Sequence, residues 1–409
     1  SSTFSGSAAG TFTAFTATSG TLTLTPTTNY TNITQVVVAQ VTYENALRPG
    51  DNVITGASGY FGLRFDTDPN TLFPRGILRE ESRTNSLTYS EKFNLSPWAT
   101  SAATISPDVT TAPDGTTNAD LLYPTSTGAS REVYQPAGYS VGNTYSLSIQ
   151  AKPAGMTWMT FGAGAGSGAA ARLAFFNLSS CTVGTTGASI TATAIKLRNS
   201  YCRLTVTYTP AGSGGYMEIS PVDGDNNYTA TANGTNGIYL CGAEIEIGAF
   251  TTSYIPTYAS SASRPADIIK LSGVALSTIG ASAGTVIQED NLEGNIAANQ
   301  YAIYGNSVSP IYFDNALAIK ATNGTNVLTS GSSAVIATPI RTGLSWDASG
   351  RAISVNGATP VVDGNSFGTV GATVYVGSNN GSNTANGWLR TFSIYNTKLL
   401  GSAFTTKTT

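Results

Sequence analysis

Hydrophobic and polar residues alternate with a period of two over many short stretches of this chain, as in β-strands that bury one face. Turns bearing glycine or asparagine separate most of these stretches, and the 3.6-residue period of amphipathic helices is almost absent. The sequence therefore predicts an all-β protein. Between residues 93 and 256 the expected strands are Ala119–Tyr123, Arg131–Gln135, Thr144–Ala151, Met156–Gly162, Arg172–Asn177, Ser189–Leu197, Tyr201–Thr209, Gly215–Pro221 and Ile238–Ile247.

The spacing of these strands is typical of a β-sandwich or jelly roll, which we expect to occupy residues 76–259. A small, polar stretch that contains a proline predicts a linker at 260–267. Residues 268–409 alternate again, with a hairpin turn expected at Asp347–Gly350, and predict a second sandwich. The expected architecture is an N-terminal β arm or attachment region at 1–75, followed by two jelly-roll-like β-sandwich domains.

The N-terminal region alternates at residues 20–26 and has an apolar run at residues 36–43, but its first dozen residues would bury little surface alone. Two interpretations are open: an arm or strand that docks on a neighbouring subunit, or an ordinary β-layer of the same chain. Asp66 and Asp68 would suit a calcium loop, but the full EF-hand pattern is missing and aspartates more often cap turns.

The composition of the chain argues against some classes of binding partner. Charged residues are 11% of the 409, the net charge is −3 and the pI is near 5.1, so no nucleic-acid partner is expected. The longest apolar runs are far shorter than a bilayer span, so we expect no membrane insertion. Residues 1–10 lack the basic and apolar regions of a signal peptide, and none is expected.

The sequence contains no histidine. This removes Ser-His-Asp and Cys-His nucleophile pairs, histidine-based zinc sites and imidazole acid–base chemistry. Cys181, Cys202 and Cys241 are an odd number without Cys-x-x-Cys spacing. Each lies in or beside an apolar, strand-like segment, so buried free thiols are expected, with one disulfide as the alternative. We expect no metal site and no cofactor.

Charge is densest between residues 76 and 98. Four charged side chains fall within five positions beside an apolar strand and predict a structural, salt-bridged cluster: Arg79, Glu80, Glu81 and Arg83. The two glutamates are expected to point in opposite directions and to pair with the two arginines.

The same stretch resembles a known signature. Its residues are Gly-Ile-Leu-Arg-Glu-Glu-Ser-Arg-Thr-Asn-Ser-Leu-Thr-Tyr-Ser-Glu-Lys-Phe, from Gly76 to Phe93. They resemble the Gly-Leu-Leu-Ile-Glu-Glu-x-Arg-Thr-Asn-Leu-Leu-x-Tyr-Ser-Glu-x-Phe run of tailed-phage virion fibre proteins, the head-spike or tail-fibre domain family. The resemblance continues through Ala112–Asp120, Gly142–Pro153 and Asn233–Pro256. It implies a carbohydrate-binding-module-like jelly roll, followed by a sandwich that resembles laminin-G and concanavalin-like domains.

Enzymatic cleavage of a glycan would need two carboxylates across the sugar bond. The sequence offers four close pairs: Glu80/Glu81, Glu244/Glu246, Asp223/Asp225 and Glu289/Asp290. Glu244 and Glu246 alternate on one strand and should point to the same face. We interpret this pair and Glu80/Glu81 as structural salt-bridge material, and we expect no catalytic residues.

Glycan binding instead needs partly exposed aromatic rings beside polar side chains. The candidates are Trp158, Tyr134 with Arg131 and Gln135, Tyr216, and Tyr228 with Asn226. Each of them singly is more often a packing or turn residue than a ligand contact.

The resemblance implies a non-enzymatic virion structural protein, a fibre, spike or decoration subunit on the particle surface. Its expected partners are cell-surface polysaccharide and other capsid or tail proteins, and a homotrimer is the first expectation for its assembly. Two alternatives are a polysaccharide depolymerase of a phage tail and a bacterial secreted adhesin.

Overall fold

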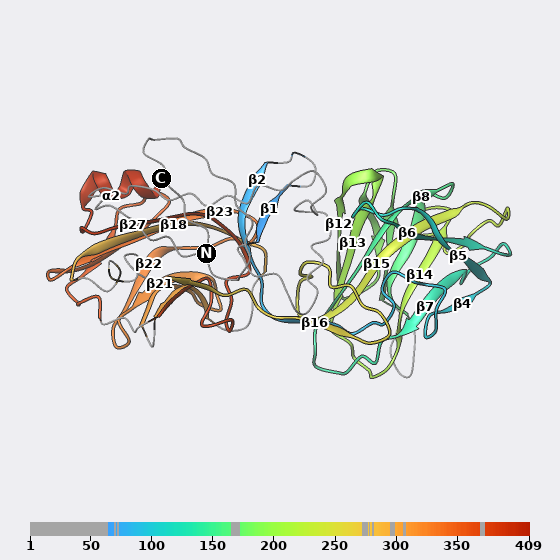
Figure 1. Ribbon diagram of the computed structural model, residues 1–409, viewed down its shortest axis with the longest axis horizontal. Coiled ribbons are helices and arrows are strands. Elements are labelled where there is room, and N and C mark those ends of the chain that lie inside the picture. Colours follow the sequence, from blue (N-terminus) through green and yellow to red (C-terminus); the bar gives the residue numbers. More distant parts are fainter. Residues whose placement is uncertain are drawn as a thin grey trace, which may run out of the picture.

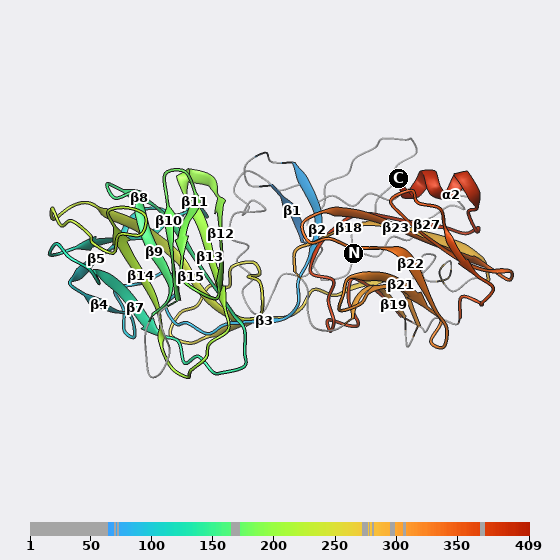
Figure 2. The ribbon, with the colours of Figure 1, turned by 180° about the vertical axis from the view of Figure 1, so that it is seen from behind.

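The computed structural model describes residues 64–68, 71, 73–164, 172–271, 277, 279, 282–294, 299–305, 308–368 and 373–409. These residues form two β-sandwiches joined by a narrow neck (Figures 1 and 2), which confirms the predicted all-β class. The described part ends in a short helix, α2 (Gly401–Thr408), and contains no helix long and apolar enough to cross a membrane. The expectations for residues 1–63 lie outside the described residues.

The first sandwich consists of two six-stranded antiparallel sheets. One has the order β11 (Thr182–Thr186), β10 (Arg172–Asn177), β9 (Trp158–Gly164), β14 (Tyr216–Val222), β7 (Glu132–Pro136), β4 (Ala99–Ser101). The other has the order β12 (Ile190–Lys196), β13 (Cys202–Tyr208), β8 (Tyr145–Ala154), β15 (Gly237–Ile247), β6 (Thr117–Pro124), β5 (Ala103–Thr111).

Alternate residues of these strands meet in one apolar core between the sheets. From the β9–β14 side it takes Met159, Phe161 and Met217, and from the β8–β13 side Leu147 and Leu204, all fully buried. Because successive side chains on a strand point to opposite faces, every second residue of β7, β9 and β14 must lie on the outer side of its sheet.

The cysteines depart from the expectation of free thiols. Cys181 and Cys202 form a disulfide with their Cα atoms 5.6 Å apart, and Cys241 is free and buried. The bond joins the turn between β10 and β11 to β13, so it links the two sheets. Sequence spacing could not reveal this pairing, since the two residues are brought together only by the packing of one sheet on the other.

The second sandwich packs a seven-stranded sheet on a six-stranded one. The first has the order β1 (Phe65–Thr67), β2 (Pro74–Arg79), β27 (Gly387–Tyr395), β18 (Gly284–Leu292), β23 (Pro339–Asp347), β24 (Gly350–Val355), β25 (Val361–Asp363). The second has the order β17 (Ile269–Leu271), β26 (Val374–Val376), β19 (Gln300–Gly305), β20 (Val308–Phe313), β21 (Ala318–Thr322), β22 (Val327–Ser333).

Two short strands from before the first sandwich belong to the sheet of the second. β1 pairs with β2, and β2 pairs with β27 through Ile77 opposite Leu389 and Leu78 opposite Trp388. The predicted boundary at residue 76 therefore falls inside β2. The chain crosses from the second sandwich to the first after Arg79 and returns near Arg264.

The neck is a two-stranded ribbon of β3 (Arg83–Asn85) and β16 (Ala262–Arg264). Figure 1 places β16, and Figure 2 places β3, at the narrow point between the lobes. Residues 262–264 of the predicted linker form a paired strand rather than a free segment. Small side chains of this strand fit the close pairing, in which Thr84 and Ser263 share a hydroxyl hydrogen bond of 2.7 Å.

Candidate functional site

The outer side of the β11–β10–β9–β14–β7–β4 sheet carries aromatic and acidic side chains. On three of these strands, Val133, Met159 and Met217 point into the core. The residues next to them in sequence must therefore point outward. We call this side the aromatic face, defined by Glu132, Tyr134, Trp158, Tyr216 and Glu218. Three of the seven predicted glycan-binding residues lie on it: Tyr134 and Tyr216 are side by side, and Trp158 is at the other end of β9.

Tyr134 and Tyr216 form the centre of the aromatic face. Their ring centroids are 5.0 Å apart with an interplanar angle of 45°, and both side chains are partly exposed. Opposite Tyr134 on the edge strand lies Ala99, whose small side chain leaves this border open. On the other side a Cβ atom at Gly164 would collide with the Tyr216 ring and the Glu218 carboxylate. The glycine therefore lets both side chains lie flat on the sheet.

Glu132 and Glu218 lie on the neighbouring strands β7 and β14, beside the two rings. Glu218 is directly opposite Tyr134, and Glu132 lies two residues before Tyr134 on the same side, so the two carboxyl groups are diagonal neighbours that interact. Burial and the Glu132 charge raise the pKa of Glu218 to about 8, and burial raises the pKa of Glu132. The pair thus holds a proton at neutral pH, and it presents both a donor and acceptors at the base of the rings.

Trp158 and Tyr228 lie at the opposite end of this sheet. Tyr228 is 51% exposed and packs edge-on against the buried ring of Phe175, with centroids 4.9 Å apart. Asn226 is in the turn after β14 with φ of 51°, a left-handed conformation that suits asparagine. The neighbouring Asp225 accepts a hydrogen bond from the Thr185 amide at 2.7 Å.

Two of the predicted glycan-binding residues make structural contacts instead. Gln135 points to the opposite side from Tyr134 and is buried, where its amide exchanges hydrogen bonds of 2.9 and 3.0 Å with the backbone of Thr88. Arg131 donates to the backbone carbonyls of Ser126, Thr127 and Ala129 and so holds its own loop. Neither side chain belongs to the aromatic face.

The sequence does not single out Glu132, Glu218 and Gly164, because the two glutamates lie far apart along the chain. Glu132 precedes Tyr134 by two residues and Glu218 follows Tyr216 by two. On strands this spacing places each pair on one side, so alternation around the two tyrosines was the signal that could have found them.

The charged run is buried at the junction, but its pairing differs from the expectation. Only Arg83 and Glu81 pair within the run, at 2.5 Å. Arg79 pairs with Asp290 of the second sandwich at 2.6 Å, since β2 belongs to that sheet. Glu80 lies between Arg64 and Arg264 at 2.7 and 2.6 Å. The cluster is therefore structural and joins segments far apart in sequence.

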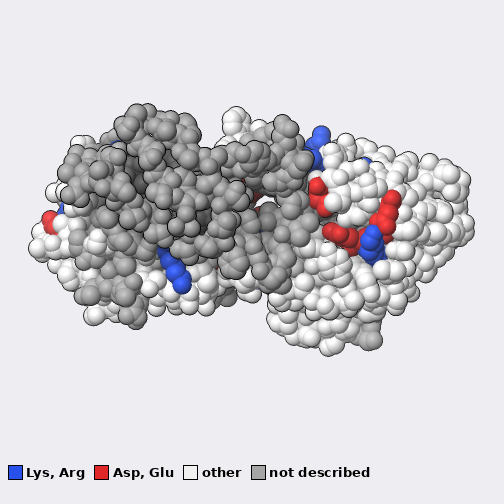
Figure 3. Space-filling view, viewed as in Figure 1, with Lys and Arg blue, Asp and Glu red and all other residues white. Residues whose placement is uncertain are grey.

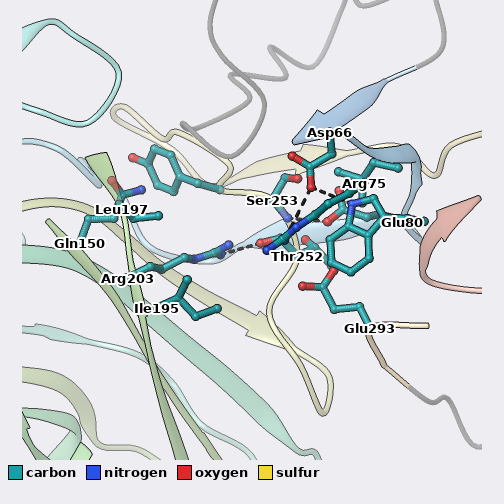
Figure 4. Close-up of a pocket in the computed structure, with 13 residues that line it drawn as sticks. Asp66, Arg75, Glu80, Gln150, Ile195, Leu197, Arg203, Thr252, Ser253 and Glu293 are labelled. Carbon is teal, nitrogen blue, oxygen red and sulfur yellow. Dashed lines mark hydrogen bonds and ion pairs between the residues drawn. The ribbon is translucent and has the colours of Figure 1, made fainter. Parts of the chain in front are cut away.

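A polar pocket of about 100 Å³ lies next to this cluster (Figure 4). Its lining comes from both sandwiches and includes Arg75, Glu80, Arg203, Glu293 and Trp388. Burial and the charge of Glu80 raise the pKa of Glu293 to about 7. Figure 4 shows Arg203 reaching Thr252 and the Ser253 backbone meeting Glu80. The pocket mixes both charges, and most of its charged groups are engaged with one another.

Asp66 and Asp68 act as acceptors in the β1–β2 region. Asp66 accepts the Trp388 indole N–H at 2.7 Å, and Asp68 pairs with Arg75 at 2.9 Å. The first contact fixes this hairpin to β27 of the second sandwich, and the second lies within the hairpin.

Glu244 and Glu246 point to the same side of β15, as predicted. Glu244 accepts the Ile255 amide at 2.9 Å and pairs with Arg203 at 3.2 Å. Glu246 accepts the Thr252 amide at 2.7 Å. Burial raises the pKa of both groups, and the two buried carboxyls tie the loop after β15 to the sheet.

Comparison with known proteins gives no matching family model and no matching curated protein. Similar solved structures include the carbohydrate-binding module CBM40 of a Ruminococcus gnavus sialidase bound to α2,3-sialyllactose. It is 15% identical, the match covers 35% of this chain and 96% of that one, and the TM-score is 0.29. Domains LG4-5 of the mouse laminin α1 chain are 9% identical, with 85% and 97% of the two chains covered and a TM-score of 0.25. Likenesses at this level carry no argument about the ligand.

Proposed function

We propose that this chain is a non-enzymatic surface protein of a tailed-phage virion, a fibre, spike or decoration subunit that attaches the particle to cell-surface polysaccharide. The observation that carries the glycan-binding part is the pair of partly exposed rings, Tyr134 and Tyr216, with two carboxyl groups beside them. Aromatic rings stack on the apolar faces of sugars, and carboxyl groups meet sugar hydroxyls.

The virion part of the proposal rests on the sequence resemblance from Gly76 to Phe93 and its continuation along the first sandwich. The Cys181–Cys202 disulfide supports a location on a particle or cell surface, because such bonds persist in oxidising surroundings. Other capsid or tail proteins and further copies of this chain, in a homotrimer, are the proposed partners.

The strongest case for a depolymerase is the Glu132–Glu218 pair with its raised pKa values. Its geometry favours binding, however. The two carboxyls are neighbours on one face of a sheet, whereas the two carboxyls of a glycosidase flank the sugar bond that is cleaved.

The test is binding of purified protein to host polysaccharide and to a glycan array, together with an assay for released reducing ends. We expect binding without cleavage. Tyr134→Ala and Tyr216→Ala should each weaken binding about tenfold or more, since each removes a stacking ring. Tyr258→Ala is the matched control, because this tyrosine is 74% exposed and lies outside the aromatic face. Reducing ends that vanish in Glu218→Gln would assign the site to hydrolysis instead.

A further inference from the structure

The aromatic face carries acidic groups without basic ones among its described residues. Of the six strands in this sheet, only β10 contains an arginine or lysine, Arg172. Arg172 alternates with Leu173 and so shares its side of the strand with Ala174, a residue of the core. It therefore does not lie on the aromatic face.

The surrounding loops add no basic group to the face. Arg131, next to Glu132 in sequence, has its guanidinium hydrogen-bonded to carbonyls of Ser126 and Ala129 at 2.6 Å and of Thr127 at 3.1 Å. Residues 165–171, between β9 and β10, include no charged residue in the sequence. The turn after β14 contributes two more acids, Asp223 and Asp225.

The charge of the face follows from these neighbours. Burial and the Glu132 charge raise the pKa of Glu218 to about 8, so at pH 7 Glu218 holds a proton beside a negative Glu132. Glu132 is only 8% exposed, so its surroundings screen that charge less than water would. An anionic group on a ligand stacked over Tyr134 and Tyr216 would meet this charge with no described cation to offset it.

We propose that the aromatic face selects sugars without charge and rejects sugars that bear carboxylate, sulfate or phosphate groups. This inference rests on the glycan-binding function proposed above. Hydroxyl groups of an uncharged pyranose match the pair, because one carboxyl offers a donor and both offer acceptors. The two rings provide the apolar contact that such a sugar needs. Figure 3 shows a largely uncharged described surface on the side it displays, in keeping with few charges on the whole chain.

The experiment is a glycan array that holds neutral oligosaccharides beside their sialylated and sulfated forms, probed with the full chain at pH 7. We expect the acidic forms to bind at least about tenfold more weakly than their neutral parents, the cost of placing like charges together. In a Glu132→Gln, Glu218→Gln double variant, the ratio of the affinities for neutral and acidic forms should fall below about threefold, whatever affinity both forms lose.

A second measurement tests the proposal even if the double variant does not fold. For the wild-type chain, raising the salt concentration from about 50 mM to about 500 mM should reduce the difference in affinity between neutral and acidic glycans. Salt screens the repulsion between the acidic glycans and the carboxylate of the aromatic face. Equal or tighter binding of the acidic forms by the wild type would overturn this inference and leave the glycan-binding function intact. Absence of binding to any glycan would overturn both.

Discussion

Glu80 and Glu81 are neighbours in sequence, but their carboxylates have very different surroundings. The Glu80 side chain is 3% exposed and contacts Arg64, Arg264 and the Ser253 amide. Although burial alone would raise its pKa, the two guanidiniums hold the pKa of Glu80 down at about 2. The Glu81 side chain is 21% exposed, pairs with Arg83 and accepts a hydrogen bond from the Asn386 side-chain amide at 3.3 Å. The pair offers a controlled test of the junction cluster.

We expect Glu80→Gln to lower the free energy of unfolding by about 3–5 kcal/mol, since it leaves the buried guanidiniums of Arg64 and Arg264 to share the carboxylate of Asp267. Glu81→Gln should change it by about 1 kcal/mol or less. Because the folded-state pKa of Glu80 is depressed, its contribution is present above pH 4.5 and is lost as the pH falls toward 2. Urea unfolding at several pH values checks both points, and equal effects of the two variants would contradict the assignment.

The candidate site shows how far single residues could be predicted. Tyr134 and Tyr216 were chosen because ring-bearing residues on strands suit sugars, and the structure places them together. Gln135 was chosen for its side-chain chemistry, but strand alternation turns it to the other side of the sheet. The Glu132–Glu218 contact depends on the pairing of β7 with β14, which no local pattern specifies.

At the scale of elements, the Cys181–Cys202 disulfide should stabilise the packing of the two sheets. We expect the Cys181→Ser, Cys202→Ser double variant to lose about 2–4 kcal/mol of unfolding free energy, as for a bond that closes a loop of this size. Reductant should destabilise the wild type by a similar amount and leave the double variant unchanged. Free thiols in the native protein, counted under denaturing conditions, should number one, and a count of three would contradict the disulfide.

Elements with strong alternation were predictable, and short edge elements were not. The predicted Arg172–Asn177 coincides with β10, and the expected strand at Ile238–Ile247 lies within β15. β5 was missed because Pro107 interrupts its pattern, which an edge strand tolerates. β3 and β16 are three residues each, too short to show a period. Their pairing comes from the crossing of the chain between the two sandwiches.

At the scale of the whole molecule, the two sandwiches are not formed by two consecutive parts of the chain. β1 and β2 precede the first sandwich but complete a sheet of the second, and Arg64 from the same segment reaches Glu80 and Asp267. The junction is thus formed by segments from before, between and after the strands of the first sandwich. A cut that separates the N-terminal region must therefore be placed before Arg64, not at the predicted boundary of residue 76.

The last prediction concerns assembly. One shallow face with two stacked rings gives weak binding, and a particle gains retention by presenting several copies at once. The Thr-rich N-terminal region alternates like a strand at residues 20–26, and its first dozen residues would bury little surface alone, which suits docking on a neighbouring copy. We expect the full chain to be oligomeric, with a homotrimer first, and a chain that begins at Gly62 to shift toward monomer. Light scattering coupled to size exclusion measures the mass of both chains in solution.

Since the shortened chain keeps Arg64, β1 and β2, its melting temperature should stay close to that of the full chain. A full chain that is monomeric at tens of micromolar would contradict self-assembly through this region.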